Sequence, residues 1–337
     1  MKLSTPRWWY VRRGAPMGLT RLLLRPASWV WAWATARRIA RGRPFDPGVP
    51  VICVGNLTVG GTGKTPVVRA LARRLAGEGV AILTRGYGGR LQGPVRVDPA
   101  RHSAADVGDE ALMMAADAPV WVARDRAAGA AAAAAAGAKV IIMDDGHQNP
   151  SVKKTLSLVV VDGETREGEW PFGDGAVFPS GPMREPLGVG LARADAVALM
   201  LPADLDAPDG ALMALFTGKP VLIARLIPTG PPPPGPQLAF AGIGKPWKME
   251  RALQAAGCEL ADFAPLPDHA RLDDRLMKVI ARRAEVLGAS LLTSEKDWVR
   301  LPPAWRTRVT AWPVEARFED EAALDAILRR AIPSPRA

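Results

Sequence analysis

The chain of 337 residues is long enough for two domains, and its 48% hydrophobic and 23% charged residues are typical of a globular protein. Its two cysteines, Cys53 and Cys258, exclude a disulfide framework and a Cys-x-x-Cys site, which suits a reducing compartment. The net charge of +10 is concentrated in the first 45 residues, so a generally basic, nucleic-acid-binding surface is excluded.

Residues 1–45 form a basic, tryptophan-rich segment. The acidic residues begin only at Asp46, and the segment before it holds Trp8, Trp9, Trp29, Trp31 and Trp33 among many arginines. The apolar stretch between Arg25 and Arg37 falls short of the roughly 20 residues that span a bilayer, and it lacks the cleavage site of a signal peptide. Tryptophan and arginine interleaved with leucine favour a helix at the membrane surface. The alternatives are a helix packed on the rest of the protein and an RNA-binding arm, which nothing else in the chain supports.

The stretch from Val51 to Thr65 has the layout of a phosphate-binding loop. An apolar run predicts a buried strand, a glycine-rich turn follows, and a helical run begins after Lys64-Thr65. In such loops backbone N–H groups and a helix N-terminus surround phosphate oxygens, the lysine reaches the terminal phosphates, and the threonine hydroxyl binds Mg²⁺. Thr58 stands where the strict pattern has glycine, so a plain glycine-rich turn is the alternative. The predicted nucleotide-binding residues are Thr58, Val59, Gly60, Gly61, Thr62, Gly63, Lys64 and Thr65.

Short apolar strands alternate with helical runs along the rest of the chain, which predicts an α/β fold with a mostly parallel sheet covered by helices on both faces. A proline-rich stretch, 229–237, marks a linker. We therefore expect a phosphate-loop domain over 46–228 and a smaller C-terminal α/β lobe over 238–337. In that lobe the segment 309–314 is expected as one element, before a final helix at 321–331.

Two pairs of carboxylates lie at the ends of predicted elements. Asp144 and Asp145 end an apolar strand, where a phosphate-loop protein commonly holds Mg²⁺. Asp109 and Glu110 precede a helical run, and Asp109 is either a helix cap or a functional carboxylate. His269 lies early in the second lobe, and an Asp–His pair brought together across a cleft can accept a proton from an attacking hydroxyl.

Seven blocks in order resemble the tetraacyldisaccharide 4'-kinase family, the lipid A 4'-kinases of Gram-negative bacteria. They begin at Gly55-Asn-Leu-Thr-Val-Gly-Gly-Thr-Gly-Lys-Thr-Pro66 and continue with Thr84-Arg-Gly-Tyr-Gly-Gly89, Val107-Gly-Asp-Glu110, Asp144-Asp-Gly-His-Gln148, Gly181-Pro-Met-Arg-Glu-Pro186, Pro267-Asp-His269 and Thr293-Ser-Glu-Lys-Asp297. The blocks cover about residues 50–300. Thr58 belongs to this family's pattern, whereas His147 and Lys245 depart from its more common Phe and Asn.

The resemblance implies transfer of the ATP γ-phosphate, with Mg²⁺, to the 4'-hydroxyl of a tetraacylated glucosamine disaccharide 1-phosphate. It implies a catalytic set of Asp109, His269, Lys64 and Asp145, with Asp109 as the base. It further implies metal binding by Thr65, Asp144 and Asp145, and substrate binding by Arg85, Tyr87, Glu110, Arg184 and Glu185.

The implied location is the cytoplasmic face of the inner membrane, as a peripheral or monotopic protein held on membrane lipids by the N-terminal segment. No nucleic acid and no obligate protein partner are expected. Two other functions are compatible with a loop of this sequence. One is an NTPase that moves or delivers a cargo and needs only water as acceptor, and the other is a membrane or RNA adaptor with a vestigial loop. Intact Lys64, Thr65, Asp144 and Asp145 argue against the adaptor.

Overall fold

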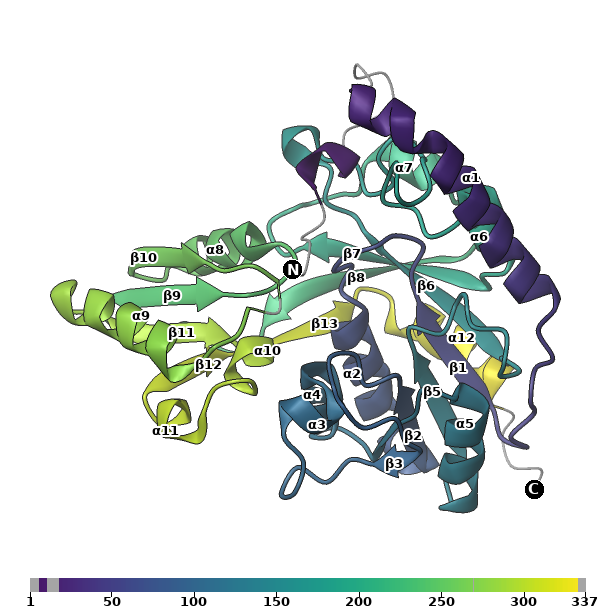
Figure 1. The fold of residues 1–337 in the computed structure, drawn as a ribbon, viewed down its shortest axis with the longest axis horizontal. Helices are drawn as coiled ribbons and strands as arrows, with labels where there is room; N and C mark the ends of the chain where they lie inside the picture. The colour runs from purple at the N-terminus through teal and green to yellow at the C-terminus, as the bar shows by residue number, and fades with distance from the viewer. Residues whose placement is uncertain (1–5, 11–17, 269, 333–337) are drawn as a thin grey trace.

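The computed structural model describes residues 6–10, 18–268 and 270–332, and it places them in two α/β lobes joined side by side (Figure 1). The sheet of the larger lobe has nine strands, in the order β13 (Val314–Phe318), β8 (Val221–Pro228), β7 (Ala196–Pro202), β6 (Leu156–Asp162), β1 (Val51–Gly55), β5 (Val140–Asp144), β2 (Val80–Thr84), β4 (Val120–Val122) and β3 (Val95–Arg96). Only the edge strands β13 and β3 pair antiparallel with their neighbours.

Helices cover both faces of this sheet because alternate strand residues point to opposite sides. On one face Ile52 and Val54 of β1 join a core with α2 (Lys64–Arg74), α4 (Asp109–Met114) and α12 (Glu321–Ala331). On the other, Val51 packs toward α5 (Arg126–Ala135), and the neighbouring strands pack toward α6 (Leu187–Ala192) and α7 (Gly210–Ala214). The predicted fold class is therefore confirmed. The short elements of this lobe are α3 (Ala104–Val107), η1 (Arg7–Tyr10), η2 (Ala76–Glu78) and η3 (Arg166–Gly168).

The direction of chain progression reverses at β1, which lies between β6 and β5 and is parallel to both. Ligands of open parallel sheets bind outside the carboxyl ends of the strands at such a point. The strands β1, β5, β2 and β6 end there at Gly55, Asp144, Thr84 and Asp162. The phosphate loop and the paired aspartates therefore lie at the same edge of the sheet, although Gly55 and Asp144 are 89 residues apart in the sequence.

The smaller lobe is a parallel sheet of four strands, in the order β10 (Leu260–Pro265), β9 (Gln237–Ala241), β11 (Ser290–Ser294) and β12 (Val309–Trp312). Its strands pack on α9 (Asp274–Val286) on one face and α8 (Pro246–Ala255) on the other. The short helices α10 (Glu295–Trp298) and α11 (Pro303–Arg306) complete it.

The end of the chain departs from the expected lobe of 238–337. The segment expected as one element at 309–314 is divided at Pro313 into β12 and β13, which belong to different sheets. Proline cannot donate to a strand ladder, so the pairing with the small sheet ends there. β13 then pairs with β8, and α12 packs into the core of the larger lobe. The larger lobe is therefore built from two separate parts of the chain.

The N-terminal helix α1 (Leu19–Ala40) runs along the outer edge of the larger lobe (Figure 1). It buries polar side chains and exposes apolar ones, the reverse of an ordinary surface helix, and we call this its inverted polarity. Its buried residues are polar, namely Arg21, Ser28 and Thr35. Its exposed residues include Leu19, Leu22, Leu23, Trp29, Val30, Trp31 and Trp33. In the described parts of the chain, no helix combines the length and apolarity that crossing a bilayer requires.

Candidate active site

The predicted phosphate loop connects β1 to α2, with Lys64 and Thr65 in the first turn of the helix. Gly63 precedes this turn with a φ of 88°, in the left-handed region that glycine adopts most easily. Asn56, which the sequence analysis did not single out, ties the loop together from inside. Its buried Nδ2 donates to the carbonyl oxygen of Thr58 at 2.8 Å and to Oγ1 of Thr62 at 3.3 Å. The loop is therefore held open as a preformed anion-binding turn at a helix N-terminus.

Asp145 lies between two cations beside this loop. Its Oδ1 accepts a hydrogen bond from Nη1 of Arg184 at 2.6 Å and lies 3.8 Å from Nζ of Lys64. Burial raises the pKa of Asp145, but Lys64 and Arg184 outweigh it and hold the pKa well below its usual range. Asp145 is also the one non-glycine residue of the described chain with a positive φ, 51°. Strained backbone of this kind concentrates at functional sites.

Asp144 is buried at the end of β5. Its Oδ2 accepts a hydrogen bond from Oγ1 of Thr84 at 2.9 Å, while its buried Oδ1 has no hydrogen-bond partner. Burial, with the neighbouring carboxylates of Glu110 and Asp145, raises the pKa of Asp144 to about 7. An unpartnered carboxylate oxygen beside a second carboxylate fits a cation, which would hold Asp144 ionised.

The carboxylates alone do not form a complete metal cage, since the described residues contain no group of three or more His, Cys, Asp or Glu side chains placed to bind one ion. Mg²⁺ does not need such a cage, because it usually binds one or two carboxylates together with phosphate oxygens and water. The donor set of Asp144, Asp145 and the Thr65 hydroxyl, next to a phosphate loop, therefore fits Mg²⁺.

Arg184 and Glu185 follow the loop that packs beside the phosphate loop. Arg184 joins the two loops, because its Nε also donates to the carbonyl oxygen of Thr58 at 3.1 Å. Glu185 differs from the expected substrate contact, since its side chain is buried. Its two oxygens are each 2.7 Å from Nη2 of Arg193, and Oε1 also accepts from Nε2 of Gln148 at 2.8 Å. Its geometry fits a residue that orients Gln148 and, through it, the guanidinium of Arg184, which lies 3.4 Å from the Gln148 Oε1.

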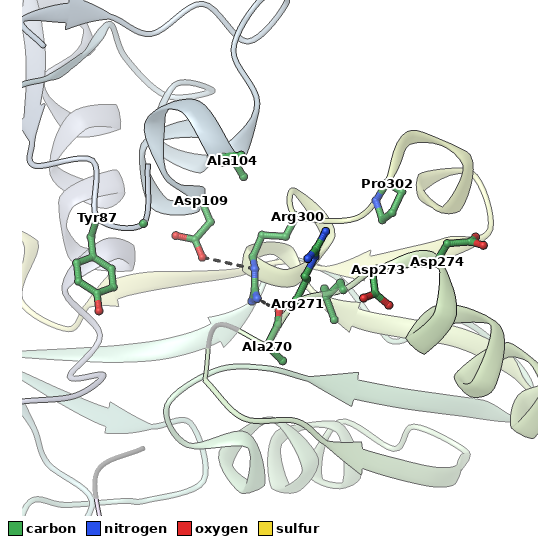
Figure 2. Close-up of a pocket in the computed structure, with 12 residues that line it drawn as sticks. Tyr87, Ala104, Asp109, Ala270, Arg271, Asp273, Asp274, Arg300 and Pro302 are labelled. Carbon is green, nitrogen blue, oxygen red and sulfur yellow. Dashed lines mark hydrogen bonds and ion pairs between the residues drawn. The ribbon is translucent and has the colours of Figure 1, made fainter. Parts of the chain in front are cut away.

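Asp109 lies across the site, where the larger lobe faces the smaller one. Gly108 is the N-cap of α4, so Asp109 is the first helical residue and does not act as the cap. Its Oδ1 accepts from the Glu110 N–H at 2.9 Å, and its Oδ2 lies 3.8 Å from Nε of Arg300 in the smaller lobe. Asp109 and Arg300 both line a cavity between the lobes with a volume of about 430 Å³. Figure 2 shows the pair among the residues that line it. Asp109 is 6% exposed.

Tyr87 lines the same cavity and is 61% exposed. A β-carbon on Gly86 would lie 2.9 Å from the carbonyl oxygen of Val107, so glycine lets the Tyr87 loop approach the start of α4. Arg85 is exposed at the end of β2. The structure therefore gathers Tyr87 and Asp109 at one cavity, while the phosphate loop does not line it. His269 lies outside the described residues.

Ion pairs connect the lobes at two further places. At the first, Lys296 of α10 contacts Glu110, with 3.1 Å between Nζ and Oε1. At the second, Lys245, which precedes α8, contacts Asp162 at 3.0 Å and Glu169 at 2.9 Å. Lys245, one of the two departures from the family pattern, is therefore part of a buried network between the lobes.

The other departure, His147, is buried on the far side of β1. Its Nδ1 lies 3.0 Å from Oγ of Ser157 and its Nε2 lies 2.9 Å from the carbonyl oxygen of Gly190. Burial lowers the pKa of His147 to about 4, so the ring is neutral at physiological pH. Both ring nitrogens are therefore engaged in hydrogen bonds within the protein.

Three comparisons with known proteins identify the family of this chain. The family model described as tetraacyldisaccharide-1-P 4'-kinase matches residues 20–333. The tetraacyldisaccharide 4'-kinase of Phenylobacterium zucineum is 70% identical over 97% of this chain and 99% of its own length, and that of Caulobacter vibrioides is 66% identical over 98% and 99%. A crystal structure of LpxK from Aquifex aeolicus in complex with ATP is 26% identical and superposes with a TM-score of 0.75, over 93% of this chain and all of that chain. The chain belongs to the tetraacyldisaccharide 4'-kinase family.

Proposed function

We propose that this chain transfers the γ-phosphate of ATP to the 4'-hydroxyl of a tetraacylated glucosamine disaccharide 1-phosphate, forming lipid IVA in lipid A biosynthesis. Membership of the family supports the reaction. The observation that carries the assignment is the convergence of Lys64 and Arg184 on Asp145 beside the phosphate loop, together with a cavity between the lobes that Asp109 lines.

The phosphate loop binds the nucleotide. Residues 58–65 surround the phosphates, and the N–H groups at the start of α2 face the negative charge. Lys64 and Arg184 neutralise charge that builds up on the transferred group, which is where phosphoryl transfer gains most of its acceleration. Thr65, Asp144 and Asp145 would hold Mg²⁺, which would orient and neutralise the phosphates.

The acceptor sugar occupies the cavity beside Asp109. The carboxylate of Asp109 accepts the proton of the attacking hydroxyl, as a general base within a buried site. Tyr87, Arg85 and Glu110 bind the sugar-phosphate head from the rim of the larger lobe. His269, the expected partner of Asp109, stays a prediction from the family motif Pro267-Asp-His269.

The acyl chains stay in the membrane, and α1 brings the active site to them. A helix whose apolar and aromatic residues face outward, with arginines between them, fits the headgroup region of a bilayer. We therefore place the protein on the cytoplasmic face of the inner membrane, attached from one side.

The experiment that tests this function measures transfer of labelled γ-phosphate from Mg-ATP to the disaccharide 1-phosphate in detergent micelles, for the wild type and Asp109→Asn. Asparagine keeps the size and the contact with the Glu110 N–H but cannot accept the proton. We expect kcat to fall about 10²- to 10⁴-fold while nucleotide affinity is unchanged. Asp209→Asn is the matched control, because Asp209 caps α7 far from the site and asparagine caps as well. Release of free phosphate at the same rate with and without lipid, and no labelled lipid, would instead identify an NTPase.

A further inference from the structure

The short helix η1 places one tyrosine directly against the phosphate loop. Oη of Tyr10 donates a hydrogen bond to the carbonyl oxygen of Val59 at 2.7 Å, across 49 residues of sequence. The backbone of Tyr10 is fixed as well, because its carbonyl oxygen accepts a hydrogen bond from the N–H of Trp170 at 2.7 Å. The hydroxyl therefore reaches the loop from an anchored position.

The ring of Tyr10 has a second neighbour in the smaller lobe. The ammonium group of Lys245 lies 5.0 Å from the ring centroid, a distance suited to a cation–π interaction. Lys245 is itself held by Asp162 and Glu169. The aromatic face and the hydroxyl of one side chain thus contact the smaller lobe and the phosphate loop at the same time.

Val59 is held on both sides of its α-carbon. Its N–H donates to the carbonyl oxygen of Pro182 at 2.7 Å, and its carbonyl oxygen accepts from Tyr10. Because a trans peptide is planar, its C=O and N–H groups point in opposite directions. A carbonyl held toward Tyr10 therefore turns the N–H of Gly60, which shares that peptide, away from Tyr10. Gly60 has a φ of 106° and no β-carbon, so little in its own structure prevents this peptide from rotating.

We infer that Tyr10 is a positioning residue for the nucleotide: its hydroxyl fixes the Val59–Gly60 peptide so that the Gly60 N–H faces the phosphates. The inference rests on the proposed binding of ATP by this loop and adds a residue of the N-terminal segment to the active site. The N-terminal segment would then contribute to nucleotide binding as well as to membrane contact. Loss of the hydroxyl frees the peptide, and the nucleotide must then order it on binding.

The test is Tyr10→Phe, which removes the hydroxyl and keeps the ring over which Lys245 lies. We expect the Kd for a non-hydrolysable Mg–ATP analogue, measured without lipid by calorimetry, to rise about fivefold, as the loss of one hydrogen bond predicts. The KM for ATP should rise by the same factor, with the KM for the lipid unchanged. Thr217→Val is the matched control, because the Thr217 hydroxyl also donates to a backbone carbonyl, that of Ala214 at 2.8 Å, but lies in the turn after α7.

An analogue Kd within twofold of the wild type would overturn the inference, and a fall in melting temperature alongside it would show that Tyr10 only anchors the N-terminal segment. The inference and the proposed kinase activity can fail separately. Wild-type protein that binds the analogue and releases phosphate without labelling lipid would refute the kinase, while a weakened analogue Kd in Tyr10→Phe would still support the role of Tyr10. Equal weakening in Thr217→Val would also overturn it, since the effect would then not depend on the loop.

Discussion

Because α1 exposes its apolar side chains, we predict that Trp29→Ser combined with Trp33→Ser weakens binding of the protein to membranes. Trp29 and Trp33 are 70% and 61% exposed, so neither contributes much to packing within the protein. A tryptophan has about 200 Å² to bury, which leaves ~130 Å² exposed on each. If half of that area enters the bilayer interface, the two residues together transfer ~130 Å², worth about 3 kcal/mol. The partition coefficient onto membranes should then fall about a hundredfold.

Sedimentation with vesicles that contain anionic lipid measures this partition coefficient, and activity in detergent micelles measures whether the site is intact. We expect the double variant to lose vesicle binding and to keep its KM for ATP. The control is Val279→Ser combined with Val286→Ser, since these valines of α9 are 63% and 82% exposed but lie on the smaller lobe. A partition coefficient within threefold of the wild type would refute the assignment of α1 to the membrane surface, and an equal loss in the valine pair would show that any exposed apolar side chain suffices.

Two further variants test the site and the network between the lobes. Arg184→Lys should lower kcat roughly 10- to 100-fold, because a lysine cannot hold Asp145 and the phosphate loop together as the guanidinium does; an unchanged kcat in steady-state assays would contradict this. Lys245→Asn should lower the free energy of unfolding by about 2 kcal/mol. This is less than the cost of breaking a buried ion pair completely, because Lys248 still contacts Asp162. Burial raises the pKa of Asp162, but Lys248 and Lys245 outweigh it and hold the pKa well below its usual range. The ion pairs of ionised Asp162 with these lysines therefore stabilise the folded protein above about pH 4, and this stabilisation is lost as the pH falls. Melting curves of Lys245→Asn should therefore depend less on pH below 4 than those of the wild type.

The phosphate loop and the strand that ends in Asp144 could be predicted from the sequence because their signals are local. An apolar run such as Val51–Val54 can only be a buried strand when a glycine turn and a helix follow it directly. The carboxyl-edge rule for parallel sheets then places Asp144 at the same edge of the sheet as Lys64, and the pairing of β1 with β5 brings the two ends together.

The positions of β13 and Glu185 could not be predicted in the same way. Strand order is set by burial of whole sheet faces, and nothing local in Val314–Phe318 distinguishes the larger sheet from the smaller one. Pro313 was the available signal for the division, since a proline within a strand pattern argues against one continuous strand. The burial of Glu185 depends on its ion pair with Arg193, which lies eight residues away at the far end of α6, and charge alone does not show which carboxylates are already paired.

The charges around the cavity give the smaller lobe a part in the proposed reaction. The larger lobe contributes four carboxylates to the site, Asp109, Glu110, Asp144 and Asp145, and both substrates bring phosphates. Lys64 and Arg184 compensate the carboxylate beside the loop, but the Asp109–Glu110 pair faces Lys296 and Arg300 of the smaller lobe instead. An anionic acceptor that enters beside Asp109 therefore meets Lys296 and Arg300 of the smaller lobe in addition to Arg85 of the larger one. The contacts of Lys245 with Asp162 and with Tyr10 join that lobe to the phosphate loop as well, so the smaller lobe contacts both the acceptor side and the nucleotide side of the site.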